Sequence, residues 1–251
     1  MNRGLLSLIS VGLMLLCLSV IVTGVSGNPA NEIVAKPSLA PTIDGVIGSA
    51  EWTTASNVTF NQTTVYVMQN GLDLFVAFNI SDNTENSQDT CTIFFDVEHD
   101  GSSELQADDL ELVIERDGNL TELKTTYFGP PHNKYFWTIA TVSGWTAEVN
   151  SSSTLWQVEY NITYSKINVT AGSTKILGVE FQSYDVASST SYTWPHTDDP
   201  LFSFKPNIWG NMTPNDFNWI PEFSNPLIQI MAFIVTLPIL FYVKAHKKIH
   251  K

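Results

Sequence analysis

Residues 65–78 read VYVMQNGLDLFVAF, two apolar runs separated by an Asn-Gly pair. Valine, tyrosine and phenylalanine favour extended backbone, and each run is too short to form a stable helix. The Asn-Gly pair supplies the positive φ angles that a tight hairpin turn requires. This stretch therefore predicts a β-hairpin.

Similar apolar runs recur along the chain, at 92–95, 110–115, 120–127, 135–142, 145–149, 155–160 and 176–184. Turn residues separate them, and helical periodicity is nearly absent between residues 40 and 205. Only residues 164–169 have the pattern of a short helix. About ten strands with this spacing predict one all-β domain at residues 41–205, an antiparallel β-sandwich of jelly-roll-like form.

Both ends of the chain have the pattern of export and anchoring signals. Residues 1–27 start with a basic residue, continue with an apolar run and end on small residues, which predicts an N-terminal signal peptide; an uncleaved N-terminal anchor is the alternative. Residues 227–243 carry no charge and precede a basic tail at 244–251, which predicts one C-terminal transmembrane helix with a cytoplasmic tail. The domain would then lie outside the cell, between an N-terminal extension at 28–40 and a proline-rich stalk at 206–226.

The charge of the chain excludes one class of partner. Twelve basic and 25 acidic residues give a net charge of −13. Without the two terminal signals, seven basic residues remain against the same 25 acidic ones, a net charge of about −18. Such a surface repels phosphate groups, so we expect no nucleic-acid binding. Cys91 is the one cysteine outside the signal peptide and is expected to be a buried core residue.

Five short motifs occur in a characteristic order: IDGVIG at 43–48, LDLFVAF at 72–78, DTCTIFFD at 89–96, WQVEY at 156–160, and a loop with a Trp-Pro pair at 191–200. Together they resemble the family-9-like carbohydrate-binding domains, a β-sandwich group related to DOMON domains. The resemblance implies a sandwich fold and a non-catalytic, glycan-binding function. At residues 161–163 the sequence NIT replaces an apolar-proline pair of that family, so the resemblance implies the fold more than the ligand.

A second resemblance concerns the anchor. The segment IPEF at residues 220–223 precedes the predicted membrane helix. It is similar to the sorting signals of archaeal surface proteins, in which a Pro-Glu-Phe type motif marks the helix for processing. The resemblance implies a protein held at the cell membrane with most of its chain extracellular.

Aromatic rings beside polar side chains are the usual recognition elements for sugars, because ring faces pack on C–H groups while polar groups bond to the hydroxyls. The resemblance favours Trp194, in a loop with nearby acids. The candidate carbohydrate-binding residues are Trp194, Tyr192, His196, Asp198, Trp145 and Trp137. The alternative for each tryptophan is a structural role in the core.

The acidic segment 96–103 reads DVEHDGSS, with carboxylates at alternate positions before a glycine. This pattern is typical of loops that wrap oxygen atoms around Ca²⁺, although no complete EF-hand is present. The candidate ligands are Asp96, Glu98, Asp100, Ser102, Asp108 and Asp109. A solvated acidic turn is the alternative.

Sequons of the form N-x-S/T predict a glycosylated exterior. They begin at Asn57, Asn61, Asn79, Asn119, Asn150, Asn161, Asn168 and Asn211. The main rival to glycan binding is therefore a structural envelope glycoprotein whose sandwich is only a spacer.

A third possibility is a haem protein, because some DOMON relatives hold a b-type haem between methionine and histidine. The candidate ligands are Met68, His99, His132 and His196. We weigh it below the other two, since a methionine on a strand is normally a core residue. No catalytic motif is present, and the sequence predicts that the protein is not an enzyme.

Overall fold

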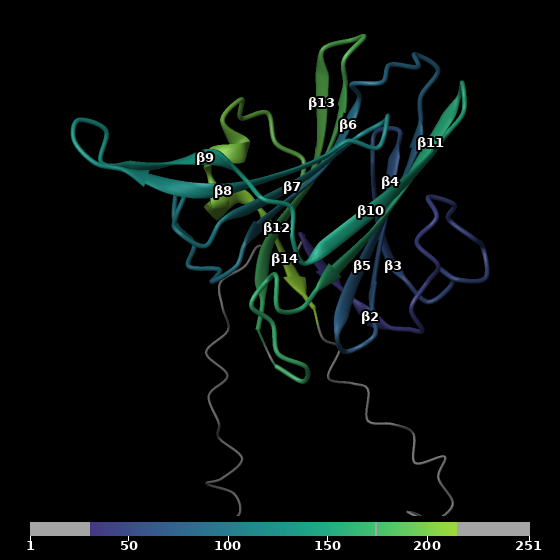
Figure 1. Cartoon of the computed structure of the whole chain (residues 1–251), viewed down its shortest axis with the longest axis horizontal. Coiled ribbons are helices and arrows are strands. Elements are labelled where there is room, and N and C mark those ends of the chain that lie inside the picture. Colours follow the sequence, from purple (N-terminus) through teal and green to yellow (C-terminus); the bar gives the residue numbers. More distant parts are fainter. Residues whose placement is uncertain (1–30, 174, 215–251) are drawn as a thin grey trace, which may run out of the picture.

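The structure is a computed structural model that describes residues 31–173 and 175–214. The predicted signal peptide, membrane helix and basic tail lie outside these residues. None of the helices in the described part of the chain has the length and apolar character that crossing a bilayer requires. The described residues form an all-β domain of two sheets packed as a sandwich, which confirms the predicted fold class (Figure 1).

One sheet has eight strands and the other has six. The eight-stranded sheet has the order β1-β14-β12-β6-β7-β8-β9, with β13 also paired to β12. Its strands are β1 (Glu32–Val34), β6 (Thr90–Asp96), β7 (Leu110–Glu115), β8 (Leu120–Phe128), β9 (Lys134–Ala140), β12 (Leu177–Asp185), β13 (Thr190–Trp194) and β14 (Gly210–Thr213).

The six-stranded sheet has the order β10-β11-β5-β4-β2, with β3 also paired to β4. Its strands are β2 (Lys36–Pro37), β3 (Ser56–Phe60), β4 (Thr63–Gln69), β5 (Asp73–Ser81), β10 (Trp145–Ser151) and β11 (Leu155–Thr163). Two short 3-10 helices, η1 (Phe202–Phe204) and η2 (Pro206–Ile208), precede β14.

The predicted hairpin is present as β4 and β5. Met68 pairs with Phe75 and Gln69 with Leu74, so the turn lies at the Asn-Gly pair. Gly71 has a φ angle of 90°. The Asn70 side-chain oxygen accepts hydrogen bonds from the backbone N–H groups of Leu72 and Asp73, which closes the turn.

The main core fills the space between the two sheets. Alternate residues of most strands point into it, including Val65 and Val67 on β4 and Ile93 and Phe95 on β6, all of them fully buried. Cys91 is also buried in this core, as expected.

A second, smaller cluster lies around Trp52 and explains the first motif of the sequence. The buried carboxylate of Glu159 accepts hydrogen bonds from Trp52 Nε1 at 2.7 Å and from the backbone N–H groups of Asp44 and Gly45 at 3.0 Å each. Gly45 has a φ angle of 80°, and a Cβ atom there would lie 2.5 Å from the Val149 carbonyl carbon. The IDG and tryptophan residues therefore anchor the opening loop on β11.

Two domain boundaries and one helix expected from the sequence were wrong. Residues 32–37 belong to the sandwich, because β1 pairs with β14 and β2 with β4, both in parallel; the sheets are therefore mixed, with antiparallel pairs in the majority. Residues 206–213 are not a stalk, because β14 pairs with β12 and buries Met212 in the main core. Residues 164–168 form a turn instead of a helix.

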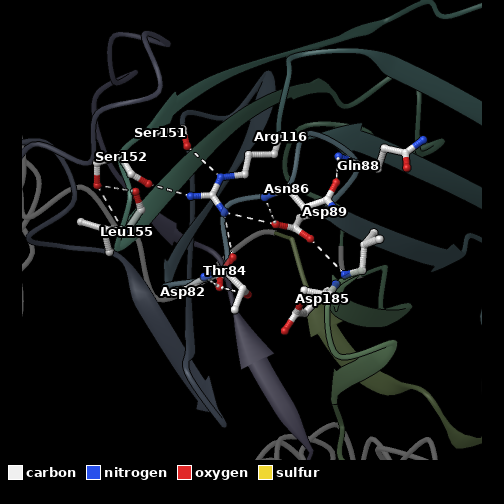
Figure 2. A network of polar contacts seen from close by, with 12 residues as sticks. Asp82, Thr84, Asn86, Gln88, Asp89, Arg116, Ser151, Ser152, Leu155 and Asp185 are labelled. Carbon is white, nitrogen blue, oxygen red and sulfur yellow. Dashed lines mark hydrogen bonds and ion pairs between the residues drawn. The ribbon is translucent and has the colours of Figure 1, made fainter.

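One end of the sandwich is held by the buried side chain of Arg116 (Figure 2). Its Nη1 atom lies 2.7 Å from an Asp82 carboxylate oxygen and 3.1 Å from an Asp89 oxygen. Its Nε donates to Ser151 Oγ and its Nη2 to the Ser152 carbonyl oxygen. A single guanidinium therefore joins strand ends from both sheets.

Candidate functional site

A surface hollow of about 320 Å³ lies between the turn that joins β3 to β4 and the end of β13. Its polar lining comprises Asn61, Ser191, Tyr192, Thr193, His196 and Thr197. Tyr192 is partly buried against the main core, whereas Asn61 and His196 are exposed. The hollow therefore combines the aromatic rings of Phe60 and Tyr192 with hydroxyl, amide and imidazole groups.

Three of the predicted carbohydrate-binding residues lie at or beside this hollow. Tyr192 and His196 line it. Asp198 lies next to His196, with 3.4 Å between its carboxylate oxygen and His196 Nε2, and both side chains are exposed. The family resemblance pointed to this loop, and the structure places its polar groups together.

Trp194 lies on the same strand but has a packing role in this structure. Its ring is half-buried and stacks on Phe181, with 5.6 Å between the ring centroids and 24° between the planes. Residues 192 and 194 lie on the same face of β13, and both pack against the main core.

The other two predicted tryptophans lie elsewhere. Trp145 was a wrong prediction as a sugar platform, because its side chain is buried, stacks on Tyr160 and donates from Nε1 to Glu122 at 3.0 Å. Trp137 lies on β9, four strands along the sheet from β12. Its indole is half-buried and donates to the Ser203 carbonyl oxygen at 3.1 Å.

Three of the six predicted metal ligands come together. Asp96, Asp108 and Asp109 each offer one carboxylate oxygen, and these atoms lie within 4.8 Å of one another. Burial raises the pKa of Asp109 to about 8, and the nearby charge of Asp96 acts in the same direction. Burial also raises the pKa of Asp96. These shifts show that negative charge is costly at this point of the protein.

The other three predicted metal ligands form hydrogen bonds or ion pairs with other residues. Glu98 is exposed and pairs with Lys175 at 3.0 Å. Asp100 accepts a hydrogen bond from the backbone N–H of Ser102, and Ser102 Oγ accepts one from the Gln106 side chain. The sequence analysis considered His99 only as a haem ligand, whereas its Nδ1 atom lies 3.9 Å from Asp96 Oδ2. Calcium binding itself stays a prediction.

The structure also shows which sequon asparagines are exposed to solvent. Asn57, Asn61, Asn119, Asn150 and Asn168 are exposed, and Asn79 and Asn161 are partly exposed. Asn211 was a wrong prediction for a folded domain, because it is buried on β14 between β1 and β12 and has no room for a glycan.

The haem alternative gains no support. Met68 is fully buried in the second cluster with Trp52 and Phe75, where it fills space between side chains. His132, by contrast, is exposed at the β8–β9 turn.

No protein-family model and no curated protein matches the sequence. Among solved structures, the chain is similar to a carbohydrate binding module of family 9 (CBM9) from Caldicellulosiruptor kristjanssonii. The complex of that module with cellotriose gives a TM-score of 0.55 at 18% identity, covering 75% of this chain and 97% of the other. Its complex with glucose gives a TM-score of 0.55 at 19% identity, covering 76% and 100%. This domain has a CBM9-like fold.

The comparison confirms the fold that the five motifs implied. Such a fold is compatible with many ligands, so the residues of the hollow must carry the functional argument. Asn61, Ser191 and Thr193 were missed by sequence reasoning. Asn61 is 131 positions from Tyr192 in the numbering, and no local pattern connects the two.

Proposed function

We propose that this chain is a non-catalytic cell-surface protein that binds a glycan in the hollow beside Tyr192. The observation that carries the proposal is the convergence of the Phe60 and Tyr192 rings with several polar groups in a hollow of about 320 Å³. That volume lies in the range of small-ligand sites. The Tyr192 ring can pack on sugar C–H groups, while the hydroxyls of Ser191 and Thr197 can bond to sugar hydroxyls.

The net charge of the protein indicates which class of glycan can bind. The region between the two terminal signals carries about −18 net charge, which repels polysaccharides bearing carboxylate or sulfate groups. A neutral glycan is therefore the ligand we propose. The structural neighbours, which hold cellotriose and glucose, support this choice.

The same hollow supports binding without catalysis. Hydrolysis of a glycosidic bond requires two carboxylates on opposite sides of the bond. None of the described residues that line the hollow is an aspartate or a glutamate. The ligand would therefore be held and released unchanged.

The cell-surface location rests on the sequence pattern of the two ends. We propose that residues 227–243 anchor the protein in the membrane and that the sandwich stands outside the cell. The domain to be presented includes residues 32–34 and 211–213, since β1 and β14 pair with each other.

Retention of the purified full-length chain on immobilised neutral polysaccharides tests the binding proposal. Tyr192→Ala should weaken retention about tenfold, the equivalent of ~1.4 kcal/mol, because the stacking surface is lost. His196→Ala, at an exposed position, should weaken it without lowering the melting temperature.

Tyr127→Ala is the matched control, because Tyr127 is an exposed aromatic residue on the β8–β9 hairpin. It should leave retention unchanged. If retention is equally strong after both Tyr192→Ala and His196→Ala, the hollow is not the binding site.

One observation favours the second candidate function, a structural envelope glycoprotein. Asn61 lines the hollow and begins a sequon, so a glycan attached to it would occupy the space that a ligand needs. Mass-spectrometric peptide mapping of the native protein distinguishes the two functions. Full occupancy at Asn61 supports the spacer, and an unmodified Asn61 supports ligand binding.

A further inference from the structure

The loop between β6 and β7 brings a nitrogen donor next to Asp96, one of three clustered carboxylates. One oxygen each of Asp96, Asp108 and Asp109 lies within 4.8 Å of the others. The Nδ1 atom of His99 lies 3.9 Å from Asp96 Oδ2. Two ligands of one first-row metal ion, each about 2.1 Å from the metal, can be separated by up to about 4.2 Å. By this measure the imidazole is placed to share an ion with Asp96.

Three atoms of this group are buried without a hydrogen-bond partner among the described residues: Asp96 Oδ2, Asp109 Oδ1 and His99 Nδ1. The side chains of Asp96 and Asp109 are almost completely buried. Leaving a buried polar atom unpaired costs about 1–3 kcal/mol, and more if it is charged. In the described part of the chain, neither Lys nor Arg forms an ion pair with any of the three carboxylates. Three such atoms on one loop, with Asp96 close to both Asp109 and His99, point to a bound cation.

Backbone hydrogen bonds fix the orientation of each carboxylate. The N–H of His99 donates to Asp96 Oδ1 at 2.6 Å, that of Glu98 to Asp108 Oδ2 at 2.7 Å, and that of Gln106 to Asp109 Oδ2 at 2.7 Å. Each aspartate therefore uses one oxygen for the loop and keeps the other for a ligand. Such contacts around a metal site hold its ligands in position.

Gly178 on the neighbouring strand β12 leaves the room that this arrangement needs. A Cβ atom at this position would lie 2.8 Å from Asp96 Cβ and 3.2 Å from His99 Nδ1. Any side chain would push the aspartate or the imidazole out of place. The strand pairing thus supports the loop at the point where the donor atoms meet.

We propose that Asp96, His99, Asp108 and Asp109 bind a divalent first-row transition metal ion, for which Zn²⁺ is the probe, in preference to Ca²⁺. Ca²⁺ takes oxygen ligands, whereas imidazole nitrogen suits Zn²⁺ and its first-row neighbours. The ion neutralises the carboxylates and supplies a partner for all three unpaired atoms. This proposal is independent of glycan binding in the hollow.

Thermal unfolding of the chelator-treated full-length chain, with Zn²⁺ or Ca²⁺ added back, tests the proposal. Zn²⁺ should raise the melting temperature by several degrees at one equivalent, and Ca²⁺ at the same concentration should raise it less. His99→Gln should weaken Zn²⁺ binding at least tenfold in a calorimetric titration. His132→Gln, at the exposed β8–β9 turn, is the matched control and should bind as the native chain does.

A Ca²⁺ response as large as that of Zn²⁺, unaffected by His99→Gln, would overturn the proposal in favour of an all-oxygen site. No response to either ion would also overturn it. If His99→Gln does not fold, Cu²⁺ loaded at one equivalent into the His132→Gln/His196→Gln/His246→Gln/His250→Gln variant, in which His99 is the one remaining histidine, provides a second measurement. Nitrogen hyperfine coupling in its electron paramagnetic resonance spectrum supports the imidazole ligand, and oxygen-only coordination contradicts it.

Discussion

Replacement of Arg116 by leucine is expected to lower the free energy of unfolding by about 3–5 kcal/mol, because it leaves two carboxylates without their cation in a buried position. The side chain of Asp89 is 1% exposed and that of Asp82 is 11% exposed. The change also removes the hydrogen bonds to Ser151 and Ser152, which hold the β10–β11 turn (Figure 2). Urea denaturation followed by tryptophan fluorescence measures the loss.

The matched control for this experiment is Lys134→Met. Lys134 also forms an ion pair, with Glu104, but the side chains of both residues are more than half exposed. An exposed pair contributes at most about 1 kcal/mol, so this variant should unfold close to the native protein. Equal effects of the two variants would show that Arg116 does not hold the end of the sandwich together.

The second large effect is expected at Glu180, a fully buried acid on β12. Both carboxyl oxygens lie without a hydrogen-bond partner among the residues that the structure describes. Burial raises the pKa of this carboxyl from 4.5 to about 9. The residue pairs across the sheet with Phe94, whose ring contacts Phe202 and Trp209. An aromatic layer therefore borders a carboxyl group that stays protonated in the folded state.

The sign of the pH effect follows from proton counting. Between pH 4.5 and about 9 the folded protein holds a proton on Glu180 that the unfolded chain has released. The free energy of unfolding therefore falls by about 1.4 kcal/mol per pH unit across this window. Glu180→Gln removes the effect and should stabilise the protein by about 2–4 kcal/mol at pH 7.5, with little difference near pH 4.5.

Denaturant unfolding of both proteins at several pH values measures this difference. Burial also raises the pKa of Asp109 to about 8 and that of Glu111 to about 7. These groups affect both proteins alike, so the difference between the two curves isolates Glu180. Glu148→Gln, at an exposed position on β10, should follow the native curve. Parallel curves for Glu180→Gln and the native protein would contradict the expectation.

Local sequence was sufficient for the strands and for the type of fold. The hairpin at 65–78 is readable because its turn residues and both apolar runs are neighbours in the chain. The five motifs implied the CBM9-like sandwich because their order reflects the order of strands. The acidic loop was also readable, since Asp96, Asp108 and Asp109 lie on one connection between two paired strands.

The ends of the domain could not be predicted from local sequence. Residues 210–213 form a four-residue strand between Pro206 and Pro214, and proline normally ends regular structure. This strand exists because residues 32–34, nearly 180 positions earlier, pair with it on one side and β12 pairs with it on the other. No local pattern records a pairing over that distance.

The sequence by itself determined that this is an all-β domain with a CBM9-like strand order and an acidic loop. Only the tertiary structure decided which aromatic and polar groups are available. It buries Trp145 against Tyr160 and leaves Tyr192 beside Asn61 in a hollow. It brings His99 next to Asp96, while Glu98 pairs with Lys175 instead. The physical reason is that the preference for extended backbone and the alternation of apolar residues are local properties, whereas strand partners, burial and ligand geometry depend on contacts between residues far apart in the chain.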